Sequence, residues 1–263
     1  MNARAQRLCA WSGVVCLVTF FLGFWVIAGF IPPPSPKLTG EQLSDLFTGD
    51  KVRIRIGMIV SIFASALLAS WAAAISTQMC RMEGTHSALA YTNLAVGALF
   101  VLEFIFSLVI WESMTYRPRD PQVLLAMNDT AWLLFVCITS TPMLQATVMG
   151  IAVLSDRSAQ PVFPRWAGYL DFWVAVLFVP GTVAVFFQDG PFAWNGLFTW
   201  YLPLAVFTVW MVVNTKLTLE AVRREEAGGG PSGSDEPAPD VATLAAELRA
   251  VRAELDRITA TRA

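Results

Sequence analysis

Three acidic side chains lie inside long apolar stretches of the sequence, where a carboxyl group is costly: Glu103, Asp129 and Asp171. Glu103 is the deepest of them, within the string Leu99–Phe106. An ionised carboxyl group in hydrocarbon costs roughly 3 kcal/mol or more, so such residues face a bundle interior or a water-filled cavity. The group either pairs with a donor or stays in its neutral, protonated form. A neutral buried acid is a proton donor, so Glu103 is our first candidate for a catalytic acid, with hydrogen bonding between helices as the alternative.

The sequence positions of the other two acids are weaker evidence for a catalytic role. Asp129 follows Asn128 near the start of its apolar run, so either residue could instead cap a helix N-terminus. Asp171 lies about one turn into its run and could reach the membrane interface. In the catalytic interpretation, Asp129 or Asp171 orients Glu103, takes up the final proton, or serves as the acid in its place.

Aromatic residues supply the second chemical feature, since the chain has 10 tryptophans and 18 phenylalanines. Aromatic faces stabilise cations by up to about 2 kcal/mol each when desolvated. Trp132 and Trp173 are candidate walls of a substrate site because they lie near the acids in sequence. Asn93 and Asn195 are candidate polar contacts to a substrate; their alternatives are interhelical hydrogen bonding and helix capping. Lipid-facing packing remains the ordinary interpretation for most of the rings.

A protonated acid beside aromatic faces suits the protonation of an alkene or epoxide, followed by guidance of the resulting carbocation. Water must be kept from such a cation, and a membrane interior excludes it. The predicted ligand is a membrane lipid or another lipophilic small molecule.

These residues depend on helices that cross a membrane. The chain is 56% hydrophobic and 14% charged, against about 25% charged in soluble domains. Its uncharged runs are long enough to cross a hydrocarbon core of about 30 Å. Residues 1–226 are therefore predicted to form an all-α polytopic membrane helix bundle. The six predicted spans are residues 9–31, 54–76, 88–111, 127–154, 166–187 and 194–215.

Local signals refine this pattern. Thr39 and Gln42 are spaced as the start of a short amphipathic helix between the first two spans. Pro142 predicts a kink in the long fourth run. Tryptophans at the ends of runs are typical of the membrane interface. The tryptophans in such positions are Trp111, Trp166 and Trp194.

The C-terminal residues differ in composition from the bundle. Residues 227–240 are rich in glycine, serine and proline and are predicted to be a flexible linker. Residues 241–263 repeat apolar side chains at alternating spacings of four and three, which is typical of a short coiled-coil-like helix. It is either a solvated helix or a segment that docks a protein partner or a second copy. A small excess of Lys and Arg favours both termini in the cytoplasm, with the chain in the inner (plasma) membrane.

Several classes of function are disfavoured. A net charge of −2 without a basic stripe argues against nucleic acid as a partner. A single histidine, His86, and four cysteines without CxxC spacing argue against a metal centre. We expect no cofactor, since the phosphate-binding loop of P-loop ATPases is also missing from the sequence.

Four strings carry a resemblance: residues 30–36, 54–58, 161–169 and 190–196. They resemble a group of six-helix integral membrane proteins of actinobacteria, over most of residues 9–220; this likeness implies an architecture and no activity. More distantly, a small helical membrane protein with isolated carboxyl groups is similar to the integral-membrane terpene cyclases. That likeness implies a helical bundle, acidic catalytic residues, no metal and a prenylated substrate.

The leading hypothesis is a metal-independent membrane enzyme that cyclises or isomerises an isoprenoid-type substrate by proton-initiated chemistry. A non-enzymatic accessory or scaffold subunit is the first alternative, with residues 241–263 recruiting the partner. A small proton-coupled transporter that uses the same carboxyl groups is the second.

Overall fold

The computed structural model describes residues 3–84 and 86–228, and in this part of the chain the regular structure is helical, without strands. Six helical stretches of the described part are long and apolar enough to cross a membrane, which confirms the predicted all-α polytopic bundle. The six stretches are Ala3–Ile27, Lys51–Glu83, Ala88–Met114, Pro121–Ser155, Arg165–Phe186 and Leu197–Glu226. The predicted coiled-coil helix at 241–263, and the linker beyond residue 228, lie outside the described residues.

Several of the membrane-spanning stretches combine more than one helical element. The elements in chain order are α1 (Ala3–Phe21), η1 (Leu22–Ile27), α2 (Gly40–Gly49), α3 (Lys51–Glu83), α4 (Ala88–Met114), α5 (Pro121–Cys137), α6 (Ser140–Ser155), α7 (Arg165–Thr182), η2 (Val183–Phe186), η3 (Leu197–Tyr201) and α8 (Leu202–Glu226). The elements η1 and η3 are π-helical turns that extend α1 and precede α8, and η2 is a 3₁₀ turn.

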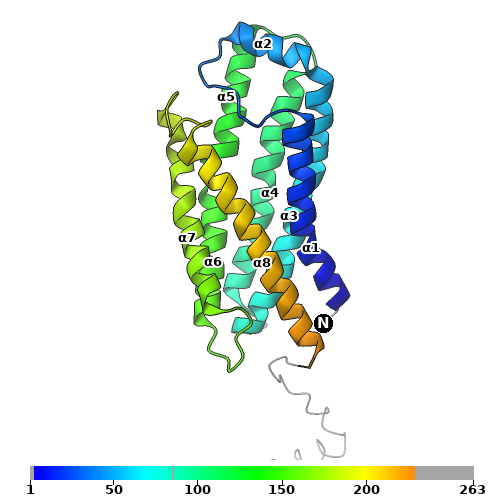
Figure 1. The fold of residues 1–263 in the computed structure, drawn as a ribbon, viewed down its shortest axis with the longest axis vertical. Coiled ribbons are helices and arrows are strands. Elements are labelled where there is room, and N and C mark those ends of the chain that lie inside the picture. Colours follow the sequence, from blue (N-terminus) through cyan, green and yellow to red (C-terminus); the bar gives the residue numbers. More distant parts are fainter. Residues whose placement is uncertain (1–2, 85, 229–263) are drawn as a thin grey trace, which may run out of the picture.

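Helix α8 crosses the bundle diagonally, from α7 at one end to α1 at the other (Figure 1). The end near α1 is held by an ion pair of 2.7 Å between Arg7 and Glu226. Deeper in the bundle, Trp71 Nε1 donates to Thr215 Oγ1 at 2.9 Å and joins α3 to α8. The beginning of α1 and the end of α8 lie at the same end of the bundle (Figure 1), as six crossings require. Which side of the membrane this end faces stays a prediction.

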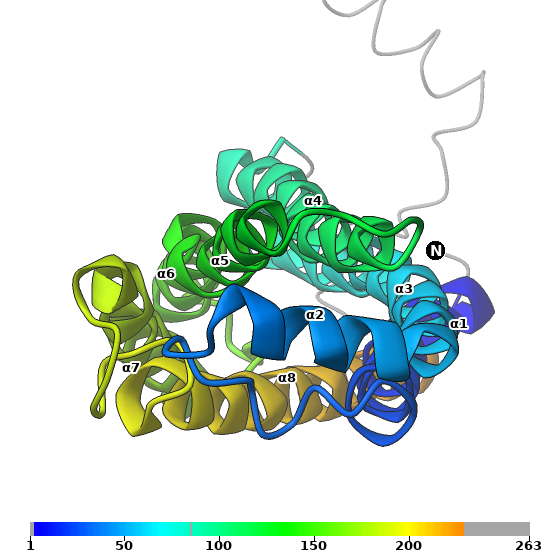
Figure 2. The same ribbon diagram turned by 90° about the horizontal axis from the view of Figure 1, so that it is seen from above.

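The short helix α2 lies across the opposite end of the bundle (Figure 2). Its start is the predicted one, because Thr39 and Gln42 form a capping box. The side chains of Leu43 and Phe47 are buried, so the apolar face of α2 packs against the spans. This helix covers one end of an aromatic core that extends between the spans.

The fourth apolar run is interrupted between α5 and α6, which is a larger break than the kink predicted at Pro142. Pro142 has no backbone N–H to donate to the carbonyl of Ile138, so one continuous helix would lose a hydrogen bond there. The helix instead stops at Cys137 and restarts at Ser140, which places Pro142 in the first turn of α6. A first-turn proline is compatible with a helix because its N–H is not needed there.

Candidate functional site

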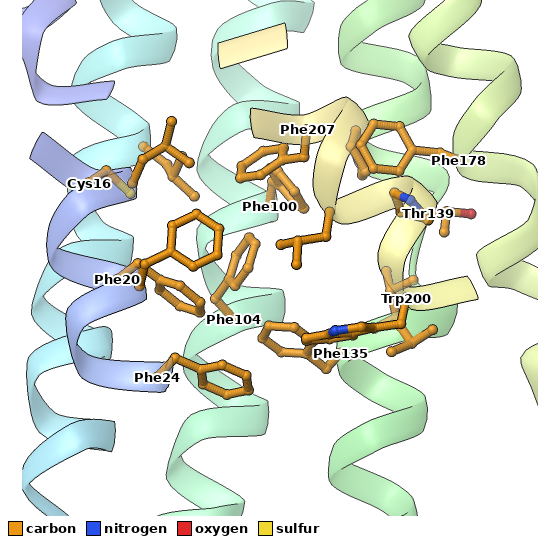
Figure 3. A pocket seen from close by; sticks show the side chains of 18 of the residues that line it. Cys16, Phe20, Phe24, Phe100, Phe104, Phe135, Thr139, Phe178, Trp200 and Phe207 are labelled. Carbon is orange, nitrogen blue, oxygen red and sulfur yellow. The ribbon is translucent and has the colours of Figure 1, made fainter. Parts of the chain in front are cut away.

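A cavity of about 100 Å³ lies inside the bundle between α1, α4, α8 and the junction of α5 and α6, and it is partly open. Aromatic rings from several helices turn toward this common space (Figure 3). The aromatic residues of the lining are Phe20, Phe21, Phe24, Phe100, Phe104, Phe135, Phe178, Trp200 and Phe207. The remaining lining residues are mostly aliphatic.

Helical spacing explains why these rings face one space. Phe20 and Phe24 are four residues apart, as are Phe100 and Phe104, so each pair shares one face of its helix or helical turn. The rings then meet across helices: the centroids of Phe20 and Phe104 are 5.3 Å apart in a T-shaped arrangement. The centroids of Phe104 and Phe135 are 5.2 Å apart, also T-shaped. Such pairs add stability beyond burial of their area and hold the rings in fixed orientations.

The cavity wall continues into a larger aromatic cluster beneath α2. Trp132, predicted as a wall of the site, is fully buried in this cluster. Its ring centroid lies 5.4 Å from that of Trp200 and 4.7 Å from that of Trp111. Trp132 is therefore packed behind the wall and supports Trp200, which itself lines the cavity.

Among the described residues, the lining contains no Lys, Arg, His, Asp or Glu. Its polar groups include two threonine hydroxyls and one indole N–H. Thr139 is hydrogen bonded to Thr182 at 2.6 Å. Thr199 Oγ1 and Trp200 Nε1 are buried and make no hydrogen bond to any described residue. The cavity is thus an uncharged, largely apolar space, and the two unpaired groups of Thr199 and Trp200, which are adjacent in sequence, form its polar corner.

Glu103 lies immediately behind the wall of this cavity. Its side chain is buried, and Thr141 Oγ1 donates a hydrogen bond to its Oε1. The other carboxyl oxygen, Oε2, is buried without a partner among the described residues. Although Glu103 is not part of the lining, its neighbour Phe104 and the neighbour of Thr141, Pro142, both are. The prediction that Glu103 occupies the bundle interior is confirmed.

Asp171 joins two helices away from the cavity lining. It is fully buried, and its Oδ1 accepts hydrogen bonds from Trp210 Nε1 at 2.8 Å and Asn214 Nδ2 at 3.3 Å. These bonds connect α7 to α8. Asp171 is therefore enclosed between α7 and α8, and its surroundings are those of a buried helix-to-helix link.

Asp129 is half-buried within α5. The alternative that Asn128 or Asp129 caps the helix is wrong, because α5 begins at Pro121 and its N-cap is Asp120. No hydrogen bond among the described residues joins Asp129, Asp171 and Glu103 to one another, and none of them lines the cavity. The structure does not assemble the three acids into one site.

The remaining predicted contacts also lie outside the lining. Trp173 is 64% exposed on the outer surface of α7, so it forms no wall of the cavity. Asn93 donates from Nδ2 to Ser76 Oγ at 2.8 Å, which is the interhelical role considered for it. Asn195 is half-buried in the segment before η3 and is not its N-cap, which is Gly196.

Sequence reasoning did not single out the residues that form the cavity. The repeated Phe spacing of four residues in the first and third spans was an available signal. Thr199 and Trp200 gave none, because their exposure to a cavity depends on the π-helical geometry of η3. Comparison of the chain with protein-family models, curated proteins and solved structures finds no match.

Proposed function

We propose that the protein is a multi-pass membrane protein whose aromatic cavity binds one end of an uncharged lipophilic molecule, of isoprenoid or acyl type. The observation that carries this proposal is the lining itself, which is rich in aromatic rings and lacks charged side chains. Ligand sites are typically concave and apolar with few polar groups. A charged headgroup would be left without a counter-ion in this space, which disfavours it strongly.

The size of the cavity limits what it can enclose. A cavity of about 150 Å³ lined by apolar side chains accommodates benzene, whereas drug-sized ligands occupy about 300–1,000 Å³. A space of about 100 Å³ therefore suits the end of a chain rather than a whole long molecule. The rest of the ligand would leave through the open side.

Helices α1 and α8 both contribute to the wall of the cavity. These helices contact each other near the Arg7–Glu226 end and diverge toward the end covered by α2 (Figure 1). Side chains of both helices line the cavity. Because these walls belong to membrane-spanning helices and the cavity is partly open, we expect the ligand to reach it from the bilayer.

Proton chemistry on the bound chain is the second candidate function, favoured by the buried, unpartnered Oε2 of Glu103 beside the wall. If the acid turned toward the cavity past Phe104, its O–H bond would break as a C–H bond formed on an alkene. The cation would then return a proton from a neighbouring carbon to the carboxylate. This step gives an isomer of the substrate and restores the protonated acid. The small volume favours isomerisation of a chain end over cyclisation of a long chain. The accessory role would depend on residues 241–263, and a transporter would need carboxyl groups along its path.

A photoreactive hydrocarbon tests the binding proposal. We would incubate the purified full chain in nanodiscs with an oxygen-free aliphatic diazirine, irradiate it, and map the labelled peptides. Labels are expected on η1, α4 and α8 residues that line the cavity. Leu204→Trp, which fills the cavity, should remove these labels, whereas Leu144→Trp on an exposed position of α6 should not. Labelling confined to the outer surface, unchanged by Leu204→Trp, would refute the proposal.

A further inference from the structure

We propose that the polar corner formed by Thr199 and Trp200 recognises a carbonyl oxygen at the end of the bound lipophile. This inference rests on the proposed binding function and names the chemical class of its ligand. It starts from two buried donors: Thr199 is 2% exposed and Trp200 is 5% exposed. Neither Thr199 Oγ1 nor Trp200 Nε1 has a hydrogen-bond partner within residues 3–84 and 86–228, and both residues line the cavity.

The chemistry of the two groups selects the ligand atom. An indole N–H can only donate, and a hydroxyl can donate as well as accept. A carbonyl oxygen has two lone pairs and can accept from either group. A hydrocarbon end would leave both donors unpaired, which is unfavourable in a buried site. A carboxylate or phosphate would also accept, but the lining holds no cation to offset its desolvation.

The backbone that carries Thr199 and Trp200 has a rare π-helical geometry, which supports a ligand-binding site here. Thr199 and Trp200 belong to the π-helical turn η3, and Phe24 on the cavity wall belongs to the π-helical turn η1. The ring centroids of Phe24 and Trp200 are 6.2 Å apart, so the two turns meet at the cavity. π-Helical turns within α-helices are rare and occur frequently at functional sites.

Neighbouring contacts hold the corner in place. The Trp200 ring lies 5.8 Å from Phe135 and 5.4 Å from Trp132, centroid to centroid. Its backbone N–H donates to the Gly196 carbonyl at 3.0 Å. The aromatic neighbours restrict rotation of the indole, so the direction of its N–H is set before a ligand binds. A preorganised donor loses little entropy on binding and gives specificity for an acceptor.

Competition against the hydrocarbon diazirine tests this assignment. The label has no oxygen and its diazirine nitrogens are weak acceptors, so its binding depends little on hydrogen bonds from the polar corner. Competitors are 2-undecanone, which has the carbonyl near one end, and undecane, which lacks it. We expect 2-undecanone to compete better than undecane. Thr199→Val and Trp200→Phe should each lower the affinity for 2-undecanone relative to undecane about five- to tenfold, in keeping with the loss of one hydrogen bond.

Two variants repeat the same chemical changes elsewhere. Thr208→Val removes a hydroxyl that bonds its own helix at the Leu204 carbonyl, and Trp166→Phe alters an exposed indole. Both should leave competition by 2-undecanone unchanged. If Thr199→Val and Trp200→Phe do not alter it either, while the diazirine still labels the cavity, the carbonyl assignment is wrong and the binding proposal stands. If the folded protein takes up no label in the cavity, both proposals fail.

Discussion

Thr141 Oγ1 donates a hydrogen bond to Glu103 Oε1, and this bond joins α6 to α4 directly behind the wall of the aromatic cavity. It gives the Glu103 carboxyl group one partner and leaves its second oxygen without a partner among the described residues. In this arrangement Glu103 can act as a structural link between α4 and α6, or as a protonated carboxyl group that transfers its proton to a ligand. Substitutions that keep the hydrogen bond but remove the proton separate these two roles.

Glu103→Gln should keep the protein folded, because the amide oxygen can still accept from Thr141. If Glu103 is the acid of an isomerisation, the variant loses turnover by about 10²-fold or more. Lipid profiles of a host that expresses the wild type or the variant provide the measurement. An isomer of a host lipid or supplied isoprenoid should appear with the wild type alone. Equal product with both proteins would remove Glu103 from the chemistry, and Glu112→Gln at the end of α4 serves as the matched control.

Asp171→Leu should destabilise the bundle, because it leaves the buried Trp210 indole N–H unpaired and removes one of the two acceptors of Asn214 Nδ2. A loss of about 2 kcal/mol is expected, or a fall of roughly 4–8 °C in apparent Tm. Asp171→Asn keeps an acceptor oxygen and should lose less. Thermal unfolding in detergent, followed by circular dichroism, measures both variants. An unchanged Tm for Asp171→Leu, matching that of the exposed control Trp173→Phe, would contradict the structural role.

Gly57→Ala should disrupt the contact of α3 with η1. An added Cβ at Gly57 would lie 2.5 Å from the Gly23 carbonyl oxygen and 2.7 Å from the Ala28 nitrogen. Both are backbone atoms and cannot turn aside, so overpacking should cost about 1–3 kcal/mol. Gly49→Ala, where nothing lies within 4 Å of the added carbon, is the control and should be neutral or slightly stabilising. Comparable Tm values for the two variants would show that α3 and η1 separate easily.

The six spans could be predicted because hydropathy reports directly on the part of a helix that enters hydrocarbon. Their bounds were less accurate for the same reason. Helix α3 extends from Lys51 to Glu83, beyond the predicted 54–76, since polar residues continue the helix outside the apolar core. Likewise α5 begins at Pro121, six residues before the predicted start of its span, and this places Asp129 in mid-helix.

The packing of the spans could not be predicted, because helices that are apolar on all sides give no sign of which face turns inward. Trp166 is 53% exposed, as expected at a membrane interface, but Trp111 and Trp194 are buried in the aromatic cluster. Trp194 also donates from Nε1 to the Pro34 carbonyl at 2.9 Å, a contact between segments far apart in sequence. The cavity itself arises from such contacts, so its lining became known only from the structure.

Native mass spectrometry of the protein purified from membranes tests the central claim most directly. The account predicts an additional uncharged lipophilic mass bound to the wild type and to Leu144→Trp, and its loss from Leu204→Trp, in which the cavity is filled. Identification of the released molecule would also report whether its end bears a carbonyl group. An identical pattern of bound mass in all three proteins, with each shown to be folded, would contradict a ligand site in the aromatic cavity.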